Sequence, residues 1–215
     1  PLSLKKVVIT AGPTHEAIDP VRFIGNSSSG KMGFELAKRA ANLGAEVVLI
    51  SGPTSQKVEH HNIQVEHVVS ADQMFELSKS HFPSASIFIA SAAVADFKPD
   101  HSATQKIKKG ENFNKINLVP TPDILAHLGS IKENQFLVGF ALETENEIDN
   151  AKKKLKHKNL NAIVLNSLND PNAGFGGDQN KITYIQPNTA PISFELKSKQ
   201  AVAVDIFDQI IVSYE

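Results

Sequence analysis

Short apolar runs alternate with amphipathic segments along most of this 215-residue chain. The apolar runs predict strands, and apolar residues at helical spacing predict helices. The predicted strands cover residues 6–10, 46–51, 64–69, 87–92, 136–141 and 162–166. The predicted helices cover residues 31–43, 71–81, 122–132 and 147–158. Strands that are separated by helices pair in parallel, so the pattern predicts an α/β fold with helices on both faces of the sheet.

The end of the chain breaks this alternation. Residues 181–186 and 192–196 flank a turn-forming stretch, Pro187-Asn-Thr-Ala-Pro191, and predict an antiparallel hairpin. A final helix is predicted over residues 199–214. We therefore predict a Rossmann-like three-layer sandwich with a mainly parallel sheet and an antiparallel C-terminal hairpin. No repeat or linker divides the chain, so residues 1–215 are expected to form a single domain.

Composition excludes several classes of protein. A formal net charge of −1 gives no sign of a nucleic-acid-binding surface. The absence of cysteine excludes disulfides, a thiolate nucleophile and a thiolate zinc site, and it suits a reducing compartment such as the cytoplasm. No apolar run reaches the roughly 20 residues of a membrane helix. The chain starts without Met or a signal-peptide core, so we expect a processed chain or a fragment.

Two further patterns are missing. The eight histidines show no spacing that indicates a metal site, so metal ligands stay unassigned. There is also no Gly-x-Ser-x-Gly motif, which counts against a serine hydrolase of that kind.

A cluster of small polar residues, Asn26-Ser-Ser-Ser-Gly30, lies where the first predicted helix begins. The first N–H groups of a helix have no partner inside it, and the helix dipole is positive at that end. Phosphate and carboxylate groups bind at such ends. One serine would be enough for a helix cap, so the cluster favours an anion site over a cap followed by a flexible loop.

Residues 25–31 also match most of the P-loop pattern G-x-x-x-x-G-K. However, Met32 stands where that pattern needs Ser or Thr to hold magnesium. Gly25 also lies far beyond the end of the preceding strand, whereas a P-loop follows its strand directly. A P-loop NTPase is therefore the weaker alternative.

Two long polar segments, at 12–30 and about 97–121, follow strands on the carboxyl side of the predicted sheet. Ligands bind at that edge of an open parallel sheet. The second segment carries Lys106, Lys108 and Lys109, and we predict a flexible basic flap that closes over phosphates. An ordinary solvated loop is the alternative.

The predicted strand at 87–92 ends in small residues, in the stretch Ser91-Ala-Ala-Val-Ala-Asp96. Small side chains let a ligand reach backbone groups that can read a base edge, and Asp96 could accept ribose hydroxyls or help to hold magnesium. Close helix–sheet packing with Asp96 as a cap is the alternative. Phe140 could stack on a base, although a core position is more usual for phenylalanine.

Lys154 and Lys158 lie four residues apart on a predicted helix and share one face. Two like charges on one face repel, and a bound phosphate would relieve this repulsion. From the spacing alone, a solvated helix face is about as good an interpretation.

Six motifs occur in order along the chain: Ile9-Thr-Ala-Gly-Pro-Thr14, Asp19-Pro-Val-Arg-Phe23, Asn26-Ser-Ser-Ser-Gly-Lys-Met-Gly33, Ser91-Ala-Ala-Val-Ala-Asp96, Lys106-Ile-Lys-Lys109 and Val138-Gly-Phe-Ala141. Together they resemble the motifs of bacterial phosphopantothenate–cysteine ligase, an enzyme of coenzyme A synthesis. The likeness covers nearly the whole chain. Each motif is weak alone, but six in the same order are highly specific.

The resemblance implies a two-step reaction. The carboxylate of 4′-phosphopantothenate attacks the α-phosphate of CTP, which gives an acyl-cytidylate and diphosphate. The amine of L-cysteine then displaces CMP and forms the amide. The family uses Mg²⁺ and works as a homodimer. In many bacteria it is the C-terminal half of a fusion with a flavin-dependent decarboxylase, and we expect no flavin in this part.

The resemblance also implies roles for individual residues. Lys106 corresponds to the lysine needed to form the acyl-cytidylate, and Asn26 to the asparagine that handles the acyl intermediate. The cytidine nucleotide would be bound by Ala90, Ser91, Ala92, Asp96, Lys106, Pro122, Asp123, Ile124, Leu125, Phe140, Lys154 and Lys158. The substrate side would be bound by Asn26, Ser28, Ser29 and Gly30.

This sequence departs from the family pattern at two positions. Ser27 replaces a frequent histidine, and Thr121 replaces a frequent asparagine; neither has a role above. Two other functions stay open: a P-loop-type NTPase, and a non-catalytic nucleotide-binding module. The basic flap argues against the module, because a sensor has little need to sequester an intermediate.

Overall fold

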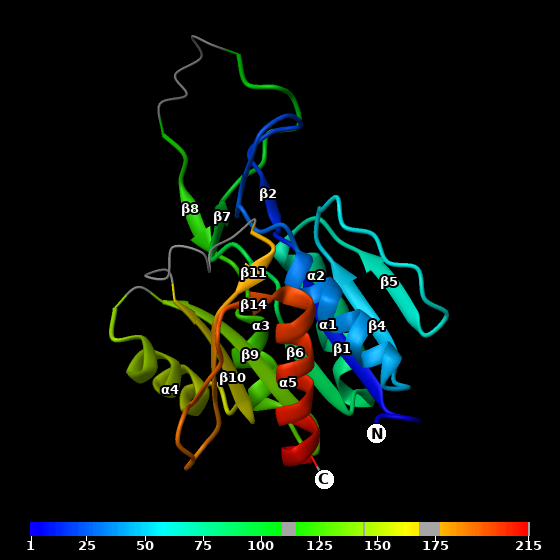
Figure 1. Cartoon of the computed structure of the whole chain (residues 1–215). Helices are drawn as coiled ribbons and strands as arrows, with labels where there is room; N and C mark the ends of the chain where they lie inside the picture. The colour runs from blue at the N-terminus through cyan, green and yellow to red at the C-terminus, as the bar shows by residue number, and fades with distance from the viewer. Residues whose placement is uncertain (109–114, 144, 168–176, 215) are drawn as a thin grey trace.

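The computed structural model describes residues 1–108, 115–143, 145–167 and 177–214. Its centre is an eight-stranded sheet with the strand order β13-β12-β10-β9-β6-β1-β4-β5 (Figure 1). All neighbouring strands from β10 to β5 pair in parallel, and helices cover both faces. The predicted fold class, a Rossmann-like sandwich, is therefore confirmed. The single domain over residues 1–215 stays a prediction.

The elements lie close to their predicted ranges. The sheet consists of β1 (Lys6–Ala11), β4 (Glu46–Ser51), β5 (Ile63–His67), β6 (Ile87–Ala90), β9 (Phe136–Glu143), β10 (Ala162–Ser167), β12 (Ile182–Ile185) and β13 (Ile192–Ser193). The helices are α1 (Lys31–Asn42), α2 (Ala71–His81), the 3₁₀ turn η1 (Phe82–Ser84), α3 (Ile124–Ser130), α4 (Glu147–His157) and α5 (Lys199–Tyr214). No described helix has both the length and the apolar character needed to cross a membrane.

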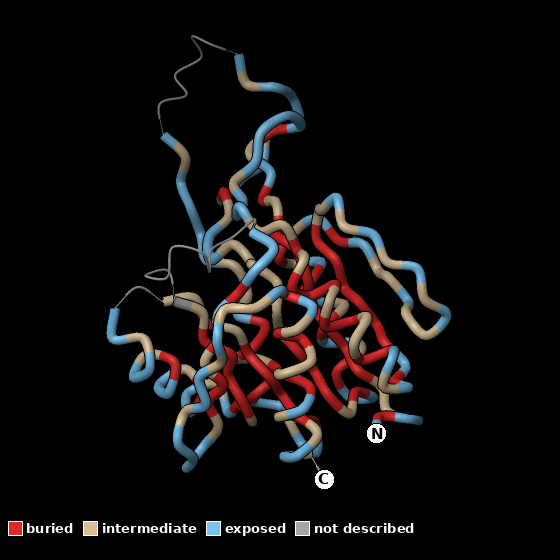
Figure 2. Tube along the Cα trace, viewed as in Figure 1, coloured by how far each residue is buried: buried red, intermediate tan, exposed pale blue. Residues whose placement is uncertain are grey.

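The sheet is buried on both faces, which explains why its central strands are continuously apolar (Figure 2). Successive side chains of β1 point to opposite faces. Val7 and Ile9 pack in the core beneath α1 and α5, whereas Val8 packs in the core beneath α2, α3 and α4. Both cores thus fix β1 in the middle of the sheet, and with it the carboxyl edge where the predicted site lies.

Several predicted elements are shorter than expected: β6 ends at Ala90 instead of residue 92, and α3 and β13 differ most. Helix α3 begins at Ile124 instead of residue 122, because the side chain of Asp123 caps it and accepts a hydrogen bond from the Ala126 N–H at 3.0 Å. The predicted hairpin is confirmed as β12 and β13, which pair antiparallel. However, β13 ends at Ser193 instead of residue 196.

Two small hairpins project beyond the carboxyl edge of the sheet and were not predicted (Figure 1). One pairs β2 (His15–Ala17) with β3 (Phe23–Gly25), and the other pairs β7 (Phe97–Pro99) with β8 (Leu118–Pro120). We call these hairpins and the described residues between their strands the arm. Strands of three residues carry no readable periodicity, which is why the sequence pattern missed them.

A third short pair joins β11 (Gln179–Asn180) to β14 (Lys197–Ser198) in antiparallel fashion. It was also missed, because each strand has two residues. This pair directly precedes α5, and it carries the start of that helix to the carboxyl edge of the sheet.

Candidate functional site

A cavity of about 650 Å³ opens at the carboxyl edge of the sheet, below the start of α1. Apart from Lys106, every residue predicted for the site lines this cavity. These residues are Asn26, Ser28, Ser29, Gly30, Ala90, Ser91, Ala92, Asp96, Pro122, Asp123, Ile124, Leu125, Phe140, Lys154 and Lys158. Segments that are far apart in the sequence therefore meet in one hollow, as expected for the carboxyl ends of parallel strands.

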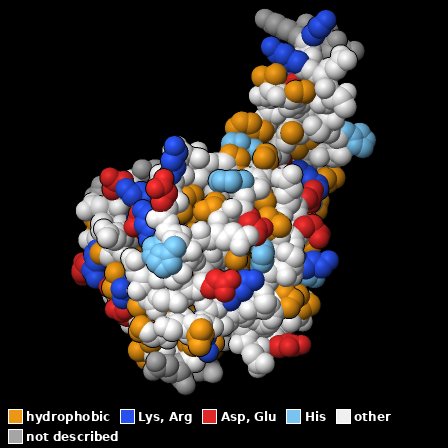
Figure 3. Space-filling model, turned by 90° about the vertical axis from the view of Figure 1, so that its right-hand side faces the viewer, with side chains coloured by type: hydrophobic (Ala, Val, Ile, Leu, Met, Phe, Trp, Pro, Cys, Tyr) orange, Lys and Arg blue, Asp and Glu red, His pale blue; other side chains and the backbone are white. Residues whose placement is uncertain are grey.

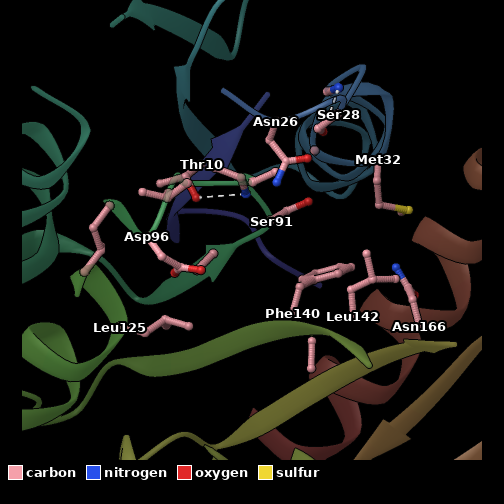
Figure 4. Close-up of a pocket in the computed structure, with 18 of the residues that line it drawn as sticks. Thr10, Asn26, Ser28, Met32, Ser91, Asp96, Leu125, Phe140, Leu142 and Asn166 are labelled. Atoms are coloured by element: carbon pink, nitrogen blue, oxygen red, sulfur yellow. Dashed lines mark hydrogen bonds between the residues drawn. The ribbon is translucent and has the colours of Figure 1, made fainter. Parts of the chain in front are cut away.

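The floor of the cavity is made by the ends of β1 and β6 (Figure 4). The Ser91 N–H donates to the Thr10 carbonyl oxygen at 3.2 Å, and the Ala92 N–H donates to the Thr10 hydroxyl oxygen at 3.3 Å. Thr10 therefore holds the two small residues in line beyond the end of β6. Short side chains there leave the backbone accessible to a ligand.

The start of α1 forms one wall. Gly30 is the N-cap residue with φ of 75°, a left-handed conformation that glycine adopts without strain, and no side chain caps the helix. The Ser28 hydroxyl instead accepts a hydrogen bond from the Gly30 N–H at 3.3 Å. The first helical residues, Lys31 to Gly33, line the cavity, so the positive end of the α1 dipole faces it.

Close packing brings this helix start down onto the sheet. A Cβ atom on Gly33 would lie 2.5 Å from the Ala11 Cβ, so only glycine allows α1 to approach β1 this closely. The Thr54 hydroxyl also donates to the Ser29 carbonyl oxygen at 2.7 Å. These contacts fix the serine cluster at the carboxyl edge.

The opposite end of the cavity carries two lysines, Lys154 of α4 and Lys158, the residue that follows this helix. Lys158 forms an ion pair with Asp123, at 2.7 Å between Nζ and Oδ2. Lys154 donates to the Phe140 carbonyl oxygen at 3.4 Å. Burial and the nearby Lys158 charge lower the pKa of Lys154. For Asp123, burial raises the pKa, but the hydrogen bonds from Lys158 and the Ala126 N–H outweigh it and the net pKa is lowered.

Lys106 is the exception among the predicted residues. It lies exposed on the arm and does not line the cavity. Its neighbour Ile107 is held to the first hairpin: the Ile107 N–H donates to Asp19 Oδ2 at 3.2 Å, and Arg22 Nη2 donates to the Ile107 carbonyl oxygen at 3.2 Å. Lys109, which was also included in the predicted flap, lies outside the described residues.

Asp19 is buried at the base of this contact. Its carboxylate accepts hydrogen bonds from the N–H groups of Val21 and Arg22, at 2.9 and 2.8 Å, and it pairs with the Arg22 guanidinium. The guanidinium holds the pKa of Asp19 well below its usual range. The ionised carboxylate of Asp19 is therefore one of the links between the two hairpins of the arm, together with the Ala103 N–H, which donates to the Ile18 carbonyl oxygen at 2.9 Å.

The geometry does not match a P-loop. Gly25 lies in the β2–β3 hairpin of the arm, so the loop does not follow β1 directly. Lys31 forms an ion pair with Asp178.

Sequence reasoning missed several residues that line the same cavity. They are Thr10, Lys31, Met32, Gly33, Ala93, Val94, Pro120, Thr121, Ala141, Leu142, Asn166, Asn180 and Lys199. Figure 4 shows Phe140, Leu142 and Asn166 on the side of the hollow that faces Met32, away from Asp96 and Leu125. Thr10, Met32 and Ala141 lay inside quoted motifs, whereas Asn166 and Lys199 belong to none.

The model of the family described as DNA/pantothenate metabolism flavoprotein C-terminal domain matches residues 2–213. The chain belongs to this family. This family assignment confirms the resemblance that the six motifs predicted. The motifs indicated the C-terminal half of a fusion protein of coenzyme A synthesis, and the matching family model also describes a C-terminal domain.

Curated relatives of this family domain are longer proteins. The chain is 45% identical over 210 residues to the coenzyme A biosynthesis bifunctional protein CoaBC of Bacillus subtilis strain 168. This match covers 98% of the chain but only 52% of that protein. It is 53% identical over 212 residues to a cysteine/cysteine sulfinic acid decarboxylase of an unknown prokaryotic organism, of which it covers 59%. The chain thus spans little more than half the length of these relatives.

Solved structures agree with the family assignment. The crystal structure of the C-terminal domain of CoaBC superposes with a TM-score of 0.83 at 41% identity, and the match covers 97% of this chain and 95% of that one. A complex of a Cab2 mutant with phosphopantothenate-cysteine superposes with a TM-score of 0.72 at 18% identity, covering 97% of this chain and 88% of that one. The second likeness supports the fold alone.

Proposed function

We propose that this chain is the ligase unit that joins 4′-phosphopantothenate to L-cysteine at the expense of CTP. The observation that carries the proposal is the cavity in which the start of α1 meets Lys154, Lys158 and the small residues after β6. The family match over residues 2–213 and the CoaBC relatives support a role in coenzyme A biosynthesis.

The proposed chemistry balances in two steps. A carboxylate oxygen of the acid attacks the α-phosphorus of CTP; this P–O bond forms as the bond to diphosphate breaks. The cysteine amine then attacks the acyl carbon, CMP leaves, and the amine loses a proton. Both steps shift negative charge onto oxygen atoms, so preorganised donors and cations accelerate them.

Residues of this chain suit these two steps. The Asn26 amide can donate to the acyl oxygen and stays neutral at every relevant pH. The N–H groups at the start of α1 and the ammonium of Lys106 can balance phosphate charge. Lys154 and Lys158, beside Phe140 and Asp123, suit the nucleotide.

Magnesium is part of the proposal. Mg²⁺ is usually held by one or two carboxylates together with substrate phosphates. Among the described residues, no group of three or more metal-binding side chains gathers. Asp96 lines the cavity, and one carboxylate beside a bound triphosphate fits this mode of binding. The ion would neutralise phosphate charge there.

We also propose that the chain forms a homodimer and that the arm is its interface. It presents large apolar side chains to solvent, with 61% exposure for Val21, 52% for Phe23 and 54% for Phe97 (Figure 3). Exposed apolar clusters of this kind mark interaction surfaces. A second copy that covers the arm would bring its own Lys106 close to the first copy. Sedimentation of the wild type and of a Phe23→Ser, Phe97→Ser double variant tests this, and equal masses would refute it.

The decisive assay follows diphosphate release with each of the four nucleoside triphosphates. We expect release with CTP only when 4′-phosphopantothenate is present, and CMP together with the amide only when cysteine is added. Hydrolysis of nucleotide without the acid would favour an NTPase instead. Affinity for CTP without turnover would favour a non-catalytic module. Carbon dioxide released from cysteine sulfinate would point to the activity named for the decarboxylase relative.

A further inference from the structure

Lys199 occupies an unfavourable position for a cation. It is the first residue of α5, where the helix dipole is positive, and the first turn contains no acidic residue. The residue is only 6% exposed, and it is one of those that line the cavity. Burial of an ammonium group is costly unless a partner compensates for it.

The neighbours of Lys199 supply that compensation only in part, through the charge of the Asp178 carboxylate. Within the described ranges, no oxygen forms a hydrogen bond or ion pair with its Nζ, and the charges that act on it come from Lys31 and Asp178. The carboxylate of Asp178 is already paired with Lys31, and its side chain is 82% exposed. Burial and the Lys31 charge both lower the pKa of Lys199. This corner of the cavity therefore carries an excess of positive charge.

Two helix starts converge on the same corner. The uncapped start of α1, at Gly30, lies beside Lys31, and the backbone N–H of Lys199 donates to the Asp178 carbonyl oxygen at 3.0 Å. The buried Asn180 also lines the cavity there, with its amide donating to Asn166 Oδ1 at 3.3 Å. The corner thus combines two ammonium groups, two helix dipoles and two amide side chains.

This corner is separate from the α4 end of the cavity. In Figure 1, α4, which carries Lys154, lies well to the left of the start of α5. One cavity therefore has two cationic ends. The nucleotide proposed for the α4 end leaves the corner at α5 with two ammonium groups, Lys31 and Lys199, and one carboxylate, Asp178.

We propose that Lys199 is a phosphate-binding residue of the ligase site. It holds a terminal phosphate group at the end of the cavity remote from Lys154 and Lys158. This inference rests on the proposed function, which supplies two such groups: the terminal phosphate of the nucleotide and the phosphomonoester of the acid. A bound phosphate group would supply the negative charge that the buried ammonium group of Lys199 lacks, and this would explain a lysine at an otherwise unfavourable position.

The test compares Lys199→Met with Lys156→Met, which removes the same charge from an exposed position on α4. Binding of CTP, 4′-phosphopantothenate and unphosphorylated pantothenate is measured by calorimetry. We expect Lys199→Met to bind one phosphorylated ligand about tenfold more weakly or worse, as expected for the loss of a charge-assisted hydrogen bond. Pantothenate should bind equally to both variants, and Lys199→Arg should recover part of the loss.

The pattern of loss identifies the phosphate. A loss confined to CTP assigns Lys199 to the nucleotide, and a loss confined to 4′-phosphopantothenate assigns it to the acid. The melting temperature of Lys199→Met without ligand gives a second readout. If Lys199 serves binding, removal of its buried charge should leave the melting temperature equal or higher. If Lys199 had a structural role, the melting temperature would fall.

Two results would overturn the inference. One is unchanged binding of both phosphorylated ligands; the other is an equal loss for all three ligands together with a lower melting temperature. Both presuppose that the wild type binds CTP and 4′-phosphopantothenate. If the wild type binds neither, the proposed function fails, and this failure is distinct from that of Lys199.

Discussion

The cavity and the arm are built in opposite ways. The cavity is lined by strand ends and helix starts that two buried cores hold in place, whereas the arm consists of three-residue strands with exposed apolar side chains. Asn26 and the proposed nucleotide residues lie in the cavity, but Lys106 lies on the arm. In the proposed reaction, the residues at the edge of the sheet would bind the ligands and the arm would deliver a cation to them.

The largest expected effect concerns that cation. Lys106→Gln should reduce diphosphate release by about 100-fold or more, because a positive charge that stabilises the transition state is lost. CTP binding should change only a few-fold, since the cavity is intact. A coupled assay measures the rate of diphosphate release, and calorimetry measures the affinity for CTP. Lys115→Gln, an exposed lysine on the same arm, is the control. Wild-type rates of diphosphate release by Lys106→Gln would show that Lys106 has no role in the reaction.

A smaller effect is expected for the cavity residue Asn26. Asn26→Asp should still release diphosphate but should form the amide about 10- to 100-fold more slowly, because a carboxylate repels the acyl oxygen and cannot donate to it. Rapid quenching that counts diphosphate and amide separately tests this. Equal losses in the two steps would show that Asn26 serves binding alone.

Packing beneath the cavity gives the third prediction. Gly33→Ala places a Cβ atom 2.5 Å from the Ala11 Cβ, so α1 must shift away from β1. We expect a loss of about 1–3 kcal/mol in the free energy of unfolding, measured in urea, together with weaker CTP binding. Gly177→Ala is the matched control, since no described residue would lie within 4 Å of its Cβ. Equal stability of the two variants would contradict the close contact of α1.

The smallest effect concerns the arm at low pH. Because the pKa of Asp19 is lower in the folded than in the unfolded chain, its carboxylate stabilises the fold above about pH 4, and this contribution is lost as the pH falls further. Asp19→Asn should therefore be less stable than the wild type at pH 7, with a difference that shrinks below about pH 4. Urea unfolding at pH 7, 5 and 3 measures it, with the exposed Asp100→Asn as control. A difference that is constant with pH would argue against the ionised link.

The sequence predicted the sheet well, because its strands are apolar runs between amphipathic helices. It also predicted most of the cavity lining, since motif residues such as Ser91 and Gly30 follow strands or precede helices at one edge. It missed the arm, whose strands are too short to show a period. It missed Lys199 because nothing local marks that lysine; only the folding of β11 and β14 brings it to the cavity.

The contact between Gly33 and Ala11 has a consequence for engineering the protein. Helix α1 rests on β1 without a spacer, so it has no room to move closer to the sheet. Attempts to change the accepted nucleotide or acid should therefore leave this wall alone. The opposite wall, where Phe140, Leu142 and Asn166 present exchangeable side chains, is the place to vary.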